Sequence, residues 1–142
     1  MGTHHKFIRV IMFTGSLLCA STFAFGQPGF MAGVDLTIEH VAGNVYMVQR
    51  PGGGGNIGAF AGPDGVLLVD SLFAPLSDKL VAAVKEVTDS EIRFLINTHI
   101  HGDHVGGNEN LAEMGVLIFA HDNTRLRFLE EKSPASPLHV FS

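Results

Sequence analysis

The feature that most constrains this chain is a polar run at residues 97–108, Asn-Thr-His-Ile-His-Gly-Asp-His-Val-Gly-Gly-Asn. Three histidines and one aspartate fall within the six positions from His99 to His104. They follow the apolar residues 94–96, which are typical of a buried strand. Open α/β sheets carry their binding sites at the carboxyl ends of strands. The run therefore predicts a buried strand that delivers polar side chains to one edge of a sheet.

The side chains in this run are of the types that bind zinc, because neutral imidazole and carboxylate oxygen are common zinc ligands. His99 and His101 are two positions apart, so an extended backbone would point both to the same side. Asp103 and His104 are adjacent and converge only if the chain turns, which Gly102 permits. The pattern favours a metal site over a purely structural polar loop, and two neighbouring metal ions over one.

This pattern resembles the H-x-H-x-D-H signature of the metallo-β-lactamase superfamily, including the Gly-Gly-Asn that follows it. The resemblance extends upstream to residues 56–58 and 65–71, and it covers about residues 38–127. It implies an α/β fold that forms the first half of an αββα sandwich, with a mixed sheet and flanking helices.

The same resemblance implies the chemistry of the site. His99 and His101 match ligands of a first Zn²⁺ ion, and Asp103 and His104 match ligands of a second. Bound zinc would lower the pKa of a water molecule toward about 7 and polarise a substrate carbonyl. Asp103 is the expected catalytic residue, since it would orient the resulting hydroxide. We therefore expect a zinc-dependent hydrolase of a β-lactam or another ester, amide or thioester.

Asp70 ends an apolar strand and matches an aspartate that supports the metal-ligand loop in this family. A carboxylate that orients ligand histidines is a common device in metal sites. The alternative is that Asp70 caps the helix that follows it. We favour the first role.

Two other functions stay open. A thioesterase similar to hydroxyacylglutathione hydrolases would carry the same Asp-His pair, although its substrate is mainly intracellular. The second alternative is a non-catalytic zinc-binding fragment, because four protein ligands around one ion would leave no place for water.

The family's third ligand of the first zinc and its bridging aspartate come later in the sequence. Only 38 residues follow His104. They contain His121, whose neighbours suggest helix capping, and His139, which has no suitable context. The sequence therefore looks like the amino-terminal half of an enzyme, and an uncovered half-sandwich is expected to self-associate.

Residues 1–26 look like a signal peptide. A positive start precedes the apolar residues 10–25, and small residues at 24 and 26 permit cleavage before Gln27. The apolar segment is shorter than the ~20 residues of a membrane-spanning helix, which disfavours an anchor. We expect a periplasmic or secreted protein without stable membrane association after cleavage, and the single cysteine, Cys19, would leave with the signal.

The rest of the chain divides into a linker, residues 27–34, and the amino-terminal part of a metallo-β-lactamase-like domain, residues 35–142. Four strands precede any helix, which suits one sheet of a layered sandwich. Strands and helices then alternate, which predicts parallel pairing. The glycine-rich residues 51–55 join two hairpins, either as a flexible connection or as a loop beside the site. No Lys-Ser/Thr follows them, so they do not form a phosphate-binding loop.

Composition narrows the choice of partners. The hydrophobic content of 46% suits a chain with a packed core. The formal net charge is −5, and without residues 1–26 seven basic and 14 acidic residues leave −7. The basic residues form no dense cluster, so we expect no nucleic-acid partner and a small-molecule substrate instead.

Overall fold

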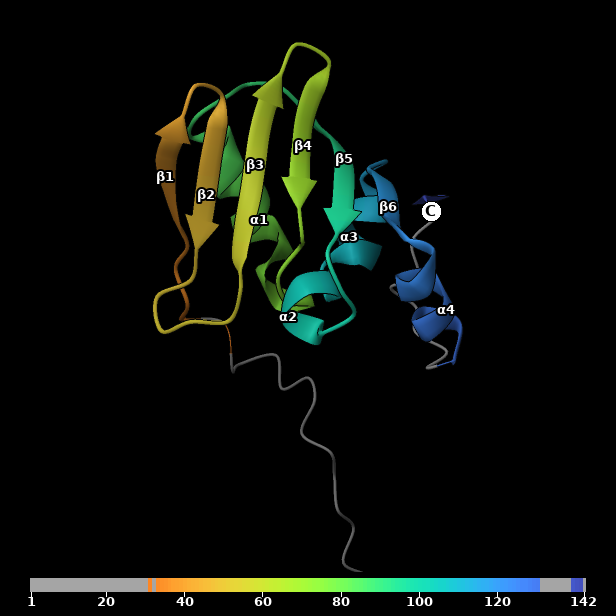
Figure 1. Ribbon diagram of the computed structural model, residues 1–142. Helices are drawn as coiled ribbons and strands as arrows, with labels where there is room; N and C mark the ends of the chain where they lie inside the picture. Colours follow the sequence, from red (N-terminus) through yellow and green to blue (C-terminus); the bar gives the residue numbers. More distant parts are fainter. Residues whose placement is uncertain (1–30, 32, 131–138, 142) are drawn as a thin grey trace, which may run out of the picture.

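The computed structural model describes Met31, residues 33–130 and the backbone of residues 139–141 (Figure 1). The predicted signal peptide and most of the predicted linker lie outside these residues. The described chain forms a seven-stranded sheet in which the strands follow one another in sequence order. The strands are β1 (Thr37–Ala42), β2 (Val45–Gln49), β3 (Asn56–Gly62), β4 (Gly65–Val69), β5 (Ile92–Asn97), β6 (Leu117–His121) and β7 (His139–Phe141).

The sheet is mixed, and its two parts differ in how the chain connects the strands. Strands β1 to β4 pair antiparallel and are joined by tight turns or by the glycine-rich residues 51–55. Strands β4 to β7 pair parallel, so helices cross between them. The helical elements are η1 (Ala74–Leu76), α1 (Ser77–Lys85), α2 (Gly102–Val105), α3 (Asn108–Glu113) and α4 (Asp122–Glu130). This is the predicted succession of elements, with α2 and β7 as additions that periodicity did not indicate.

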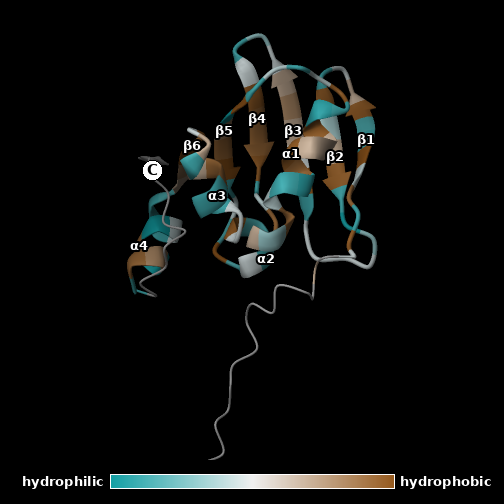
Figure 2. Cartoon of the chain, turned by 180° about the vertical axis from the view of Figure 1, so that it is seen from behind, coloured by the Kyte–Doolittle hydropathy of each residue, from teal (hydrophilic) through white to brown (hydrophobic). Residues whose placement is uncertain are grey.

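Helices α1 and α3 lie on the same face of the sheet, as the two opposite views show (Figure 1, Figure 2). Alternate side chains of the strands point toward them and are buried, because successive residues of a strand face opposite sides. The fully buried side chains include Ile57, Leu68, Leu95 and Ile118 from the strands and Leu76, Leu80 and Leu111 from the helical layer. This core holds β4 and β5 rigidly, and the candidate site lies at their carboxyl ends.

The opposite face of the sheet is also apolar. Five side chains from neighbouring strands β2 to β6 lie opposite one another and form a row across it: Val45, Phe60, Leu67, Phe94 and Leu117. The first two and the last are exposed. Figure 1 looks onto this face, and no described helix covers its strands. We call this row the open-face row.

Within the described part of the chain, no helix is both long and apolar enough to span a bilayer.

Candidate metal centre

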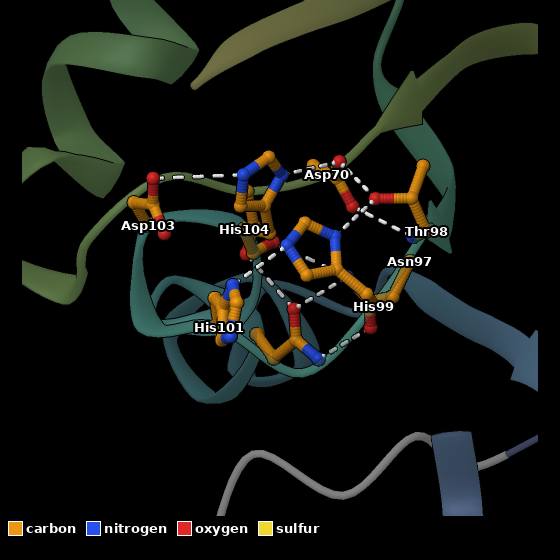
Figure 3. A network of polar contacts seen from close by, with 9 residues as sticks. Asp70, Asn97, Thr98, His99, His101, Asp103 and His104 are labelled. Carbon is orange, nitrogen blue, oxygen red and sulfur yellow. Dashed lines mark hydrogen bonds and ion pairs between the residues drawn. The ribbon is translucent and has the colours of Figure 1, made fainter. Parts of the chain in front are cut away.

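The polar run predicted as a site lies at the carboxyl end of β5, where the chain leaves the sheet and turns into α2 (Figure 3). Strand β5 ends at the buried Asn97, and His101 immediately precedes α2 in an extended conformation. The turn brings Asp103 and His104 back beside His99, whose ring centroid lies 4.0 Å from that of His104. The structure thus brings all four predicted ligand residues to one place.

The four side chains meet in two pairs. His99 Nε2 lies 3.1 Å from His101 Nδ1, and His104 Nε2 lies 3.5 Å from Asp103 Oδ2. Two ligand atoms of a tetrahedral zinc ion, each roughly 2.0–2.1 Å from the metal, are about 3.3 Å apart. Both pairs therefore have a spacing that fits two ligands of one ion, and the donor atoms are of types that zinc prefers.

A buried carboxylate connects the two pairs. Asp70 follows β4 and is only 3% exposed. Its Oδ1 accepts a hydrogen bond from the backbone N–H of Thr98 at 2.8 Å. Its Oδ2 lies 2.7 Å from Thr98 Oγ1 and 2.7 Å from His104 Nδ1. Thr98 Oγ1 in turn lies 2.9 Å from His99 Nδ1.

These contacts determine which ring nitrogen of His99 and of His104 carries the hydrogen. A carboxylate only accepts hydrogen bonds, so the Thr98 hydroxyl and His104 Nδ1 both donate to Asp70. The Thr98 oxygen then accepts a hydrogen bond from His99 Nδ1. Both Nδ1 atoms therefore carry hydrogen, and the Nε2 atoms of His99 and His104 keep lone pairs for a metal.

Asp70 could itself be considered as a ligand, because its carboxylate and the rings of His99 and His104 offer atoms within 4.8 Å of one another. Its two oxygens already accept three hydrogen bonds, however, which suits an orienting carboxylate better. It caps no helix, since Phe73 and Leu76 occupy the N-cap positions of η1 and α1. Its hydrogen bonds thus match the supporting role favoured from the sequence.

The backbone of His104 is held by a second buried network. Its carbonyl accepts hydrogen bonds from Ser71 N at 2.8 Å, from Ser71 Oγ at 3.1 Å and from Asn97 Nδ2 at 3.4 Å. Asn97 and Asn108 exchange amide hydrogen bonds of 3.1 and 2.7 Å. Asn108 of the Gly-Gly-Asn motif therefore supports the centre and is not positioned as a ligand.

The two glycines of that motif allow a close approach of backbones. A Cβ atom at Gly106 would lie 3.0 Å from Leu72 O, and one at Gly107 would overlap Ser71 O. Side chains at these positions would push α2 and α3 away from the chain that follows β4. The motif is therefore explained by packing.

Three supporting residues had no assigned role in the sequence analysis: Ser71, Asn97 and Thr98. The signal that would have pointed to Thr98 is its hydroxyl group directly before His99, at the end of an apolar strand. Of the remaining histidines, His121 accepts a hydrogen bond from Asn123 N at 3.1 Å, as expected for a capping residue. His40 lies on β1 against the Tyr46 ring.

Comparison with known proteins agrees with this geometry. Residues 41–132 match the metallo-beta-lactamase superfamily. The chain belongs to this superfamily, and the predicted fold class is confirmed. No curated protein matches the sequence significantly.

Solved structures of similar fold are metallo-beta-lactamases. FIM-1 from Pseudomonas aeruginosa, crystallised in a mono-zinc form, superposes with a TM-score of 0.65 at 21% identity, over 77% of this chain and 51% of that one. The enzyme from Hirschia baltica gives 0.62 at 27% identity, over 76% and 52%. The chain thus spans about half the length of these proteins. Together with the superfamily match, the similarity supports a metal-dependent hydrolase.

Proposed function

We propose that this chain carries the ligand-bearing half of a two-zinc hydrolase centre. The observation that supports the proposal is the convergence of the two pairs, His99 with His101 and Asp103 with His104, at the carboxyl end of β5. In this proposal the first pair holds one zinc ion and the second pair holds another. When bound, zinc supplies a Lewis acid for a carbonyl group and lowers the pKa of coordinated water toward about 7.

The chain's own residues would do the positioning. Asp70 and Thr98 keep protons on the Nδ1 atoms, so that the Nε2 atoms face the metal positions. Asp103 is half-buried, and one of its two carboxylate oxygens lies toward His104. In our proposal its carboxylate also accepts a hydrogen bond from the attacking nucleophile, which makes it the catalytic residue of this half.

The proposed substrate is a β-lactam. The similar solved structures are metallo-beta-lactamases, and one of them shares 27% identity with this chain. We further propose that the protein is periplasmic or secreted, on the basis of the signal-like residues 1–26. An exported enzyme would meet β-lactams before they reach their targets, whereas glutathione thioesters are mainly intracellular.

Metal content tests the centre directly. We expect purified chain to bind two zinc ions, measured by elemental analysis against protein concentration. His101→Ala should lose the first ion, because one of its two ligands from this chain is gone. His121→Ala is the matched control, since it removes a histidine that lies outside the centre, and it should keep both ions. Absence of zinc from the unmodified chain would contradict the proposal.

Hydrolysis tests the activity. In the complete protein, which also supplies the later metal ligands, we expect zinc-dependent turnover of a chromogenic β-lactam that Asp103→Ala abolishes and His121→Ala preserves. Turnover of a thioester but not of the lactam would support the thioesterase alternative. Stoichiometric zinc without any turnover would support a non-catalytic zinc-binding role.

A further inference from the structure

The glycine-rich residues 51–55 join β2 to β3 and reach the metal centre at their last member. Gly55 has a φ of 80°, a left-handed conformation that side chains other than glycine rarely adopt. A Cβ atom built on Gly55 would lie 3.0 Å from the backbone oxygen of Asp103, and 3.5 and 3.6 Å from Cε1 and Nε2 of His104. The backbone of Gly55 therefore packs directly against the second ligand pair.

We propose that Gly55 is a positioning residue that sets the selectivity between the two metal positions, because only a residue without a side chain leaves the Asp103–His104 pair free to bind. The inference rests on the proposed two-zinc function. The inference gives residues 51–55 a role in metal binding. From the sequence, this loop could be either a flexible connection or a loop beside the site.

The contact is selective for one pair. The three heavy atoms nearest to a Cβ at Gly55 all belong to Asp103 and His104, whereas neither His99 nor His101 is among them. The contacted edge of the His104 ring carries Nε2. This nitrogen keeps its lone pair, because the hydrogen of the ring is on Nδ1, which donates it to Asp70. A methyl group there would lie beside the atom that we propose binds the second ion, and its three nearest neighbours would all belong to the second pair.

The crowded atom cannot yield by a simple rotation. Asp103 O belongs to the backbone of α2, so relief of a 3.0 Å contact moves the segment that carries both second-site ligands. Ligand geometry tolerates displacements of only about 0.5 Å before binding suffers. A shift of a few tenths of an ångström in both ligands uses most of that tolerance, and the added methyl group, 3.6 Å from His104 Nε2, also reduces the space for an ion beside that atom. We therefore expect a weaker second site.

The loop is also unable to retreat freely. Arg50 donates a hydrogen bond from Nε to the backbone oxygen of Gly53, and its guanidinium lies 5.7 Å from the centroid of the Phe73 ring. The Arg50 side chain thus ties the middle of the loop to the segment that follows β4. We therefore expect a side chain at Gly55 to displace α2 and its two predicted ligands and to leave the loop in place.

The chain offers a matched control. Gly52 lies in the same loop with a φ of 90°, yet a Cβ there would meet nothing within 4 Å. Gly55→Ala and Gly52→Ala therefore introduce the same methyl group into equally left-handed backbone. Only the first introduces contact with the second ligand pair, so the difference between the two variants isolates that contact.

The experiment is a titration of the metal-free full chain and both variants with Zn²⁺ and with Co²⁺, whose absorption reports the coordination of each ion. We expect Gly55→Ala to bind the first ion within twofold of the unmodified chain and the second at least tenfold more weakly. Gly52→Ala should bind both ions within twofold of the unmodified chain. Thermal unfolding of the metal-free proteins checks that both variants fold.

Each other outcome contradicts the inference in a recognisable way. Unchanged binding of the second ion by Gly55→Ala would overturn the role of Gly55 and leave the two-zinc centre standing. An equal loss of both ions in Gly55→Ala, or an equal loss in both variants, would show that the loop acts on the fold as a whole. An unmodified chain that binds no ion would overturn the proposed function together with this inference.

Discussion

At the scale of single residues, the centre depends on a hydroxyl group. Thr98 Oγ1 lies 2.7 Å from Asp70 Oδ2 and 2.9 Å from His99 Nδ1. The Thr98 hydroxyl group donates a hydrogen bond to the Asp70 carboxylate, so its oxygen accepts a hydrogen bond from His99 Nδ1. Asp70 thus orients the His99 ring through Thr98, although Asp70 makes no hydrogen bond to that ring itself.

Replacement of Thr98 by valine tests this arrangement, because valine keeps the shape and removes the hydroxyl. We expect affinity for the first zinc to fall about 10- to 100-fold, the usual effect of losing a group that orients a metal ligand. Thr98→Ser should restore the affinity, since it returns the hydroxyl. Competition with a chelator measures affinity, and ¹⁵N NMR of the histidine rings reports the tautomer. Equal affinity of the valine and serine variants would contradict the relay.

At the scale of elements, the centre depends on how closely α2 and α3 approach the chain after β4. Gly107 N donates a hydrogen bond to Leu72 O at 3.0 Å, and its Cα faces the backbone of Ser71. The same segment carries Asp70 and the hydrogen bonds that hold the His104 carbonyl. Stability and metal-site geometry are therefore coupled through one contact between elements.

Gly107→Ala should lower the free energy of unfolding by about 2 kcal/mol or more, because overpacking against rigid backbone forces the elements apart. Gly102→Ala is the matched control, since its Cβ would meet only Phe73 at 3.9 Å, an ordinary contact distance. Urea denaturation of the metal-free proteins measures both. Equal stability of the two variants would show that the approach is looser than the structure indicates.

At the scale of the whole molecule, the open-face row gives the sheet two apolar faces and only one helical layer. Apolar faces of this extent are normally covered by another layer. The similar solved structures are about twice as long as the part that matches this chain. The open-face row therefore has the composition of a surface that another layer of protein would bury.

We expect the purified chain to self-associate through the open-face row. Burial of one Phe side chain contributes about 1.5–3 kcal/mol. Phe60→Lys should therefore raise the dissociation constant about tenfold or more in sedimentation experiments over a range of concentrations. Met114→Lys is the control, because Met114 is at least as exposed as Phe60 but lies at the carboxyl end of α3. A purely monomeric chain, or equal effects of both variants, would contradict this expectation.

Much of the fold, and the grouping of the predicted metal-binding side chains, could be predicted from the sequence alone. Alternation and apolar runs predicted the strands from β1 to β6. The spacing of His99, His101, Asp103 and His104 predicted two pairs of side chains, which the structure brings together, and their role as metal ligands stays a prediction. These features are local, since they depend on which residues lie within a few positions of one another. Short elements were less accessible, because α2 and β7 span only four and three residues.

Only the tertiary structure decided how the ligands are prepared for metal. Asp70 lies 28 positions from Thr98 and 34 from His104, and Gly55 lies farther still from the ring that it contacts. No periodicity links positions so distant, because their contact depends on the order of strands β3, β4 and β5 in the sheet. The sequence by itself predicted which side chains bind metal, and the packing of three strands decided which ring nitrogen of His99 and of His104 points away from the Asp70–Thr98 hydrogen bonds.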